Sequence, residues 1–175
     1  VAAGFVIFPP YVDDSLLSSV TDSKKLTAPK REHLLKAIKS ESLCAEVGWA
    51  SVAEIDELGI AVATKLAMMR AMEKSIIQPD YLLVDAVKLD ECPVPYEAVV
   101  KGDLISRTIA AASIIAKVTR DLHMSSLSME YPGYSLEKNK GYGTRDHMIA
   151  IKSRGPTDIH RGSFEPVASM KRYPG

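Results

Sequence analysis

Two aspartates are the residues best suited to do chemistry, because each one follows an apolar segment. Asp85 comes after the short run at residues 81–84, and Asp121 comes after the Ala- and Ile-rich stretch at residues 106–117. Functional groups in open α/β sheets gather at the carboxyl ends of the strands. Two carboxylates brought together need a shared proton or a cation, and Mg²⁺ prefers such oxygen ligands together with phosphate oxygens. The pair is therefore a candidate site for metal-assisted phosphoryl chemistry.

Simpler interpretations remain open for both aspartates. Asp121 can be the first solvated residue after a buried segment, with Lys117 one turn earlier as its partner. An aspartate that follows a strand, as Asp85 does, is also a common cap or turn former. The spacing of these two residues leaves the choice open.

Basic and aromatic side chains could contact a phosphate backbone. Lys24 and Lys25 lie in a short polar loop before a predicted helix, and Lys101 follows a predicted strand. The ordinary alternative for the lysines is a solvated surface. Tyr142 stands between two glycines, which would give its ring open space and a flexible backbone for stacking on a sugar or base. Such a tyrosine can equally pack back on its own domain.

Other reactive side chains show no catalytic pattern. Three histidines share no metal-ligand spacing: His123, His147 and His160. His160 stands beside Arg161 and could touch a phosphate, with a structural role as the alternative. Ser113 lies inside the apolar stretch without a base nearby in the sequence, so we expect it to bond to its own backbone.

Strands that alternate with helices must position these residues. Apolar and β-branched content predicts strands over residues 2–8, 43–50, 81–84 and 97–100. Helical spacing and end signals predict helices over residues 28–39, 52–58, 60–77, 106–130 and 145–153. The run at residues 81–84 does not alternate, which predicts a strand buried on both faces of a parallel sheet. This order of elements is typical of an α/β domain.

Several details refine these predicted elements. Ser51 and Glu54 have the spacing of a capping box. Residues 106–117 are apolar on all sides of a helix, which is typical of a buried one. Met69 and Met72 recur at helical spacing, as in a core rather than a binding surface. The tail at residues 157–175 is expected to be irregular.

Composition indicates one domain, with a sheet-and-helix core at residues 1–130 and a basic helical or loop part at residues 131–175. The net charge is zero, yet the second part carries 8 Lys and Arg against 4 Asp and Glu, which suits a polyanion. Cys44 and Cys92 lack metal-ligand spacing and are typical of reduced thiols. No apolar run approaches the ~20 residues that cross a bilayer. We expect a cytoplasmic protein without membrane contact.

Eight segments resemble, in order, the signature segments of bacterial ribonuclease HII. They are TDSKKLT at residues 21–27, EIDELGI at 54–60, PDYLLVDA at 79–86, VKGD at 100–103, IAAASIIAKVTRD at 109–121, EYPGY at 130–134, NKGYGTRDH at 139–147 and GPTDIHRGSF at 155–164. The resemblance spans nearly the whole chain, and the KGYGT segment fits the type II enzymes better than the related type III enzymes.

The resemblance implies a ribonuclease H-like α/β fold, a mixed sheet flanked by helices with a helical C-terminal extension. It also implies a monomeric endonuclease that cuts the RNA strand of RNA–DNA hybrids, and duplex DNA 5′ to a single ribonucleotide, as in ribonucleotide excision repair. Such enzymes use Mg²⁺ or Mn²⁺ and leave a 3′-hydroxyl and a 5′-phosphate. Asp85 and Asp121 match two of the family's four metal-binding carboxylates. Tyr142 matches the tyrosine that stacks on the sugar at the junction, and Lys24 and Lys25 match phosphate contacts.

One family segment has no counterpart in these residues. The family's other two carboxylates lie on a central first strand, in an Asp-Glu-Ala-Gly-Arg-Gly segment that grips the 2′-hydroxyl, and Val1 matches a point just after it. We therefore expect a fragment of a normal enzyme, inactive and poorly stable as written, because a gap in a sheet leaves backbone groups unpaired. The alternatives are a non-catalytic relative that binds RNA–DNA hybrids, and a scaffold that binds none.

Overall fold

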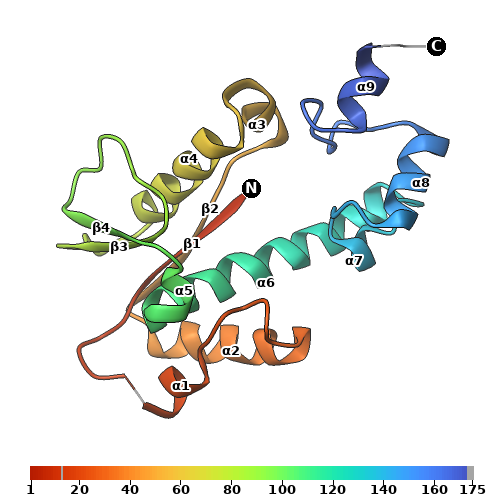
Figure 1. The fold of residues 1–175 in the computed structure, drawn as a ribbon. Coiled ribbons are helices and arrows are strands. Elements are labelled where there is room, and N and C mark those ends of the chain that lie inside the picture. The colour runs from red at the N-terminus through yellow and green to blue at the C-terminus, as the bar shows by residue number, and fades with distance from the viewer. Residues whose placement is uncertain (13, 173–175) are drawn as a thin grey trace. The chain divides into compact units, whose positions relative to one another are not determined.

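The computed structural model describes residues 1–12 and 14–172, which divide into two compact units. We call residues 2–49 and 64–119 the sheet unit. Val1, residues 50–63 and the residues from Arg120 onward form the C-terminal unit. Helices α4 (Ile60–Glu73) and α6 (Arg107–Glu130) contribute residues to both units. Figure 1 labels the elements along the chain.

The strands of the sheet unit form two separate pairs. Strand β1 (Ala2–Ile7) pairs antiparallel with β2 (Cys44–Trp49), and Ala2 lies opposite Trp49. Strand β3 (Leu82–Asp85) pairs in parallel with β4 (Tyr96–Val99), and Asp85 lies opposite Val99. The four strands predicted from the sequence are thus confirmed, with no end shifted by more than one residue.

Helix α6 provides much of the core of the sheet unit. It packs with β1, α1 (Asp14–Ser19) and α2 (Ala28–Glu41). The buried members of this cluster are Val6, Leu16, Val20, Leu34, Ile38, Ala110, Ala111, Ile114, Ile115 and Val118. The predicted burial of this helix is confirmed for the residues of this cluster, whereas Ala112, Ser113 and Ala116 are only partly buried and line a cavity.

Two glycines allow strands to lie directly on helix backbones. A Cβ atom on Gly4 of β1 would lie 2.0 Å from the carbonyl oxygen of Ala112 in α6. A Cβ atom on Gly48 of β2 would lie 2.0 Å from the carbonyl oxygen of Ala67 in α4. Both contacts require a residue without a side chain, so glycine on the strand and alanine on the helix set the spacing of the layers.

The two strand pairs leave open edges at β1 and β3. Within the described residues, β1 pairs only with β2, and β3 pairs only with β4. Both edges line a cavity of about 550 Å³, whose wall on α6 is made by Thr108, Ile109 and Ala112. A second cavity of about 190 Å³ also touches both strands. The sheet is therefore interrupted between β1 and β3.

This interruption explains why β3 is less buried than the sequence predicts. Burial on both faces was expected for the run at residues 81–84, but only Val84 is buried there, and Leu83 is 44% exposed. An unpaired edge beside a cavity leaves these side chains without neighbours on one side. The prediction of a parallel pair is confirmed, and the prediction of full burial is wrong.

The C-terminal unit consists of helices and loops. Its helices are α3 (Val52–Leu58), α7 (Leu136–Asn139), α8 (Arg145–Arg154) and α9 (Val167–Arg172), together with parts of α4 and α6. The predicted capping box of Ser51 and Glu54 is present at the start of α3. The Asp56 carboxylate of α3 accepts hydrogen bonds from the backbone of Gly162 and Ser163, which ties this helix to the tail.

Two predictions about helix extent are wrong. The tail is not wholly irregular, because α9 forms and buries Val167 against Tyr134 and Leu136. Helix α4 ends at Glu73, where Ser75 forms a turn with Met72 and turns Ile76 out to 93% exposure. In the part of the chain that the structure describes, no helix is long and apolar enough to cross a membrane.

We expect Gly48→Ala to lower the free energy of unfolding by about 2 kcal/mol, because overpacking a tight contact costs this much. Urea unfolding followed by circular dichroism measures the effect. Gly143→Ala is the matched control, since the nearest atom to its Cβ would be the Met148 sulfur at 3.8 Å. A Gly48→Ala variant as stable as the control would contradict the direct contact of β2 with α4.

Candidate functional site

Asp85 ends β3 with one carboxylate oxygen held by the backbone. Its Oδ1 accepts a hydrogen bond from the Gly102 N–H at 2.9 Å. A Cβ atom on Gly102 would lie 3.3 Å from this oxygen and 2.5 Å from Ile109 Cδ1, so glycine eases the approach. Among the residues described, none donates a hydrogen bond to Oδ2. The carboxylate is thus oriented through one oxygen while the other can take a further ligand.

The predicted lysines of the sheet unit lie near the same segment. Lys24 Nζ lies 3.9 Å from Asp103 Oδ2, and the lysine side chain is 82% exposed. Asp103 and Gly102 belong to the short helix α5 (Gly102–Ile105), and Lys101 is its exposed N-cap with a positive φ of 54°. Lys25 is also exposed. At this length, and with the lysine exposed although the Asp103 side chain is not, the ion pair leaves Lys24 able to contact a ligand.

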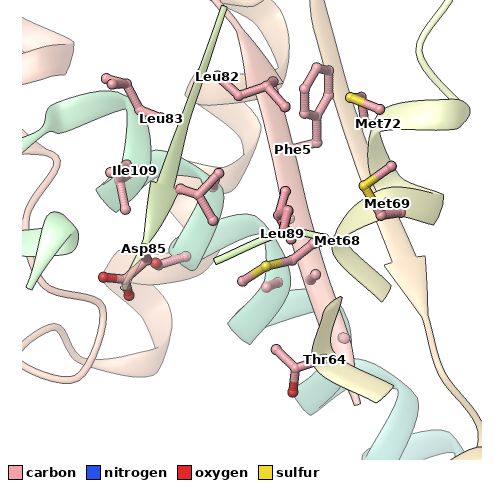
Figure 2. A pocket seen from close by; sticks show the side chains of 17 residues that line it. Phe5, Thr64, Met68, Met69, Met72, Leu82, Leu83, Asp85, Leu89 and Ile109 are labelled. Carbon is pink, nitrogen blue, oxygen red and sulfur yellow. The ribbon is translucent and has the colours of Figure 1, made fainter. Parts of the chain in front are cut away.

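An apolar cavity adjoins Asp85. Figure 2 shows its carboxylate at one end of a pocket whose other labelled side chains are mostly apolar, among them Phe5, Met68 and Met69. The cavity measures about 190 Å³. Met69 and Met72 of α4 were predicted to be core; Met72 is buried, and both residues border this cavity together with Met68. The cavity offers phosphate oxygens few partners.

Asp121 belongs to the C-terminal unit, where Arg120 connects it to the predicted tyrosine. Arg120 Nη1 lies 3.7 Å from Asp121 Oδ1, which is longer than a hydrogen bond. Arg120 Nη2 donates to the Lys140 carbonyl oxygen at 2.9 Å, and the guanidinium carbon lies 5.1 Å from the centre of the Tyr142 ring. Arg120 therefore links the helix that carries Asp121 to the loop that carries Tyr142.

The backbone around Tyr142 is held rather than flexible. Its ring is 55% exposed, as stacking requires. The Tyr142 N–H donates to the Asn139 carbonyl oxygen, and its own carbonyl oxygen accepts from the Thr144 N–H at 2.8 Å. Gly141 has a positive φ of 77° and donates its N–H to Asn139 Oδ1 at 2.8 Å. The tyrosine thus faces open space, and hydrogen bonds close the turn that carries it.

Two of the four histidines, His147 and His160, pair with each other, which the sequence did not indicate. His147 Nε2 lies 3.3 Å from His160 Nε2, and both side chains are buried. Burial lowers the pKa of His160 below its ordinary value, and nearby His147 lowers it further. Their separation of 13 positions carries no pattern that could have predicted the contact.

Arg161 adds positive charge to this unit. Burial lowers its pKa, and the nearby charge of Arg120 lowers it further. The guanidinium carbon of Arg161 lies 3.8 Å from the centre of the Phe164 ring. Two neighbouring guanidinium groups suit an anionic ligand.

The candidate residues thus fall into two sets. Asp85, Lys24 and Lys101 lie around the end of β3 in the sheet unit. Asp121 and Tyr142 lie around Arg120 in the C-terminal unit. Among the described residues, no group of three or more His, Cys, Asp or Glu side chains could hold a metal ion. Gly102 and Asp103 belong to the VKGD segment, and Arg120 belongs to the IAAASIIAKVTRD segment. Nothing in the sequence alone indicated that Gly102 contacts Asp85, that Asp103 contacts Lys24 or that Arg120 contacts Tyr142.

Comparison with known proteins assigns the family. The family model for ribonuclease HII matches residues 1–167. A ribonuclease HII from Dehalococcoides mccartyi (strain BAV1) is 48% identical over 170 residues, which cover 97% of this chain and 80% of that protein. One from Desulfitobacterium hafniense (strain DCB-2) is 50% identical over 151 residues, which cover 86% of this chain and 58% of that protein.

A solved structure shares the fold. The ribonuclease H2 from Pyrococcus horikoshii OT3 matches with a TM-score of 0.80 and 23% identity, over 98% of this chain and 89% of that one. This likeness supports the ribonuclease H-like α/β fold expected from the sequence. The family model and the bacterial relatives show that this chain belongs to the ribonuclease HII family.

Proposed function

We propose that this chain is an endoribonuclease that hydrolyses the RNA strand of RNA–DNA hybrids and cuts 5′ to a single ribonucleotide in duplex DNA, leaving a 3′-hydroxyl and a 5′-phosphate. Membership of the ribonuclease HII family supports the reaction class. The observation that carries the proposal is the Asp85 carboxylate at the end of β3, held through one oxygen by Gly102 and near the segment that Lys24 contacts.

Divalent metal is part of this proposal. Asp85 and Asp121 would hold Mg²⁺ or Mn²⁺, because both ions prefer carboxylate and phosphate oxygens. The donor chemistry fits, since Asp85 Oδ2 accepts no hydrogen bond from the described residues. When bound, such ions stabilise negative charge on the attacking and leaving oxygens. The Gly102 N–H fixes the Asp85 carboxylate before any ion arrives.

The remaining residues would bind and orient the nucleic acid. Lys24, Lys25 and Lys101 would contact phosphates, and the exposure of their side chains supports this role. Tyr142 would stack on the sugar at the junction between the ribonucleotide and the DNA. The Arg120 guanidinium beside the ring would hold it in place while adding positive charge near the phosphates.

The two units would work together as one ribonuclease H-like domain. We further propose that another strand fits in the gap between β1 and β3. This strand would carry the Asp-Glu-Ala-Gly-Arg-Gly segment that the resemblance implies. Two open edges that line the same cavity support this placement. A strand there would pair with backbone groups on both sides and cover the side chains of β3.

A second candidate function is a non-catalytic protein that binds RNA–DNA hybrids. One observation favours it: the described residues contain no group of three or more side chains that could hold a metal ion. Binding without cleavage in the presence of Mg²⁺ or Mn²⁺ would support this candidate over the nuclease. A salt-dependent titration with a labelled hybrid measures the binding.

With the Asp-Glu-Ala-Gly-Arg-Gly segment present, as in all cleavage tests proposed for this protein, Asp85→Asn and Asp121→Asn are each expected to lower cleavage of a duplex with one ribonucleotide by about 100-fold or more while sparing binding. The reason is that an amide is a poor ligand for Mg²⁺. Steady-state cleavage and hybrid titration measure the two effects. Line broadening of NMR signals by added Mn²⁺ tests the same residues without cleavage. Asp80→Asn, at an exposed aspartate, is the control. Unchanged Mn²⁺ broadening in both site variants would contradict the metal site.

Tyr142→Ala is expected to reduce cutting at single ribonucleotides by roughly tenfold, since a stacking contact contributes about 1–3 kcal/mol. Cutting of a long hybrid should fall less, because many other contacts hold it. Parallel assays on both substrates measure the difference. Tyr142→Phe keeps the ring and should keep most of the activity. An equal loss on both substrates would argue against a junction-specific role.

A synthetic peptide that contains Asp-Glu-Ala-Gly-Arg-Gly with apolar flanks is expected to raise the thermal unfolding midpoint. Any ligand that binds only the folded state stabilises it, by about 2.7 kcal/mol at 100 times its Kd. Differential scanning fluorimetry measures the shift, with a scrambled peptide as the control. If both peptides have the same effect, the proposed place of the strand is wrong.

A further inference from the structure

Four residues of the C-terminal unit form a continuous line of hydrogen bonds from the tail to the Tyr142 loop. The Thr157 N–H donates to His160 Nδ1 at 3.1 Å. The two histidines meet through their Nε2 atoms at 3.3 Å. His147 Nδ1 then contacts the Tyr142 carbonyl oxygen at 2.9 Å. Every link is therefore within hydrogen-bond distance.

The two ends of this line determine where each proton lies. A carbonyl oxygen only accepts, so His147 must carry its proton on Nδ1 and present a lone pair at Nε2. A backbone N–H only donates, and the Thr157 hydroxyl, 2.9 Å from the same nitrogen, can donate as well, so His160 presents a lone pair at Nδ1 and carries its proton on Nε2. These two requirements agree at the centre, where His160 Nε2–H donates to His147 Nε2. One proton arrangement thus satisfies all four residues.

We propose that Thr157, His160 and His147 form a neutral relay that positions the main chain of Tyr142 and so directs its ring at the substrate. The His147 bond adds to the one from Thr144, so the Tyr142 carbonyl oxygen accepts two hydrogen bonds. His147 and His160 are positioning residues, because both are buried behind the loop whose tyrosine ring is exposed. The role in substrate binding rests on the proposed nuclease function, but the relay itself does not.

Protonation of either ring would break the line. A proton on His147 Nε2 would point at the His160 Nε2–H, and two donors cannot form a hydrogen bond with each other. A proton on His160 Nδ1 would point at the Thr157 N–H in the same way. The neighbouring titratable or charged groups are Tyr134, whose ring centre lies 5.0 Å from that of His160, and Asp158, Arg161 and Glu165 near the pair.

Burial and His147 lower the pKa of His160, and they outweigh the hydrogen bond with Thr157 and the charge of Asp158, which raise it. The neutral form of His160 is therefore complete above the ordinary histidine pKa of about 6.5. It is lost only as the pH falls through the lowered value.

Long-range ¹H–¹⁵N NMR of the histidine rings tests the proton arrangement directly. One pH unit above the ordinary pKa, we expect the Nδ1–H form of His147 and the Nε2–H form of His160. The opposite form of either ring, or a charged ring at that pH, would overturn the relay. This measurement needs no substrate, so its failure is distinct from failure of the proposed nuclease function.

A double-mutant cycle tests the coupling to Tyr142. We expect His147→Phe to reduce cutting at single ribonucleotides by roughly tenfold, and His147→Asn, which keeps an N–H near the position of Nδ1, to recover much of the loss. If His147 acts through the tyrosine, His147→Phe should cost little more in a Tyr142→Ala background. Fully additive losses would overturn the positioning role. His33→Phe, at an exposed histidine of α2, is the control.

The same variants give a readout without cleavage. The amide NMR signals of Tyr142 and Thr144 should shift in His147→Phe and return toward the parent values in His147→Asn. Signals that do not move in His147→Phe would show that the relay does not hold the loop. On acidification, these signals should move together with the titration of His160, and movement at a different pH would contradict the relay.

Discussion

The direct contact of β1 with α6 is the constraint on which the sheet unit depends. At Gly4 the strand lies against the helix backbone, with no room for a side chain between them. This approach brings Val6 into the cluster with Ile114 and Ile115, so the apolar part of α6 is buried where β1 covers it.

Backbone groups hold the candidate functional residues throughout. The Gly102 N–H orients Asp85, Arg120 binds the Lys140 carbonyl oxygen, and His147 binds the carbonyl oxygen of Tyr142. Backbone atoms at the ends of helices and in tight turns are already ordered by folding. Using them as partners costs little further conformational entropy, which suits side chains that must be in place before a ligand binds.

The interrupted sheet accounts for the weakest part of the core. Strands β1 and β3 expose unpaired edges to cavities, and Leu83 is 44% exposed as a result. Open edges and apolar cavities lower stability and favour association with another strand. Asp85 lies at the end of one of these strands, so order at the candidate site depends on how well β3 is supported.

The sequence by itself determined the family, the order of strands and helices, the capping box at Ser51 and the positions of Asp85 and Asp121 at the ends of apolar segments. These features follow from residue type and local spacing, which short-range physics controls. Only the tertiary structure decided that Gly102 holds Asp85 and that His147 meets His160, across separations of 17 and 13 positions. It also decided how far β3 is buried. Contacts between distant residues leave no periodic signal in one sequence, because they depend on how whole elements pack.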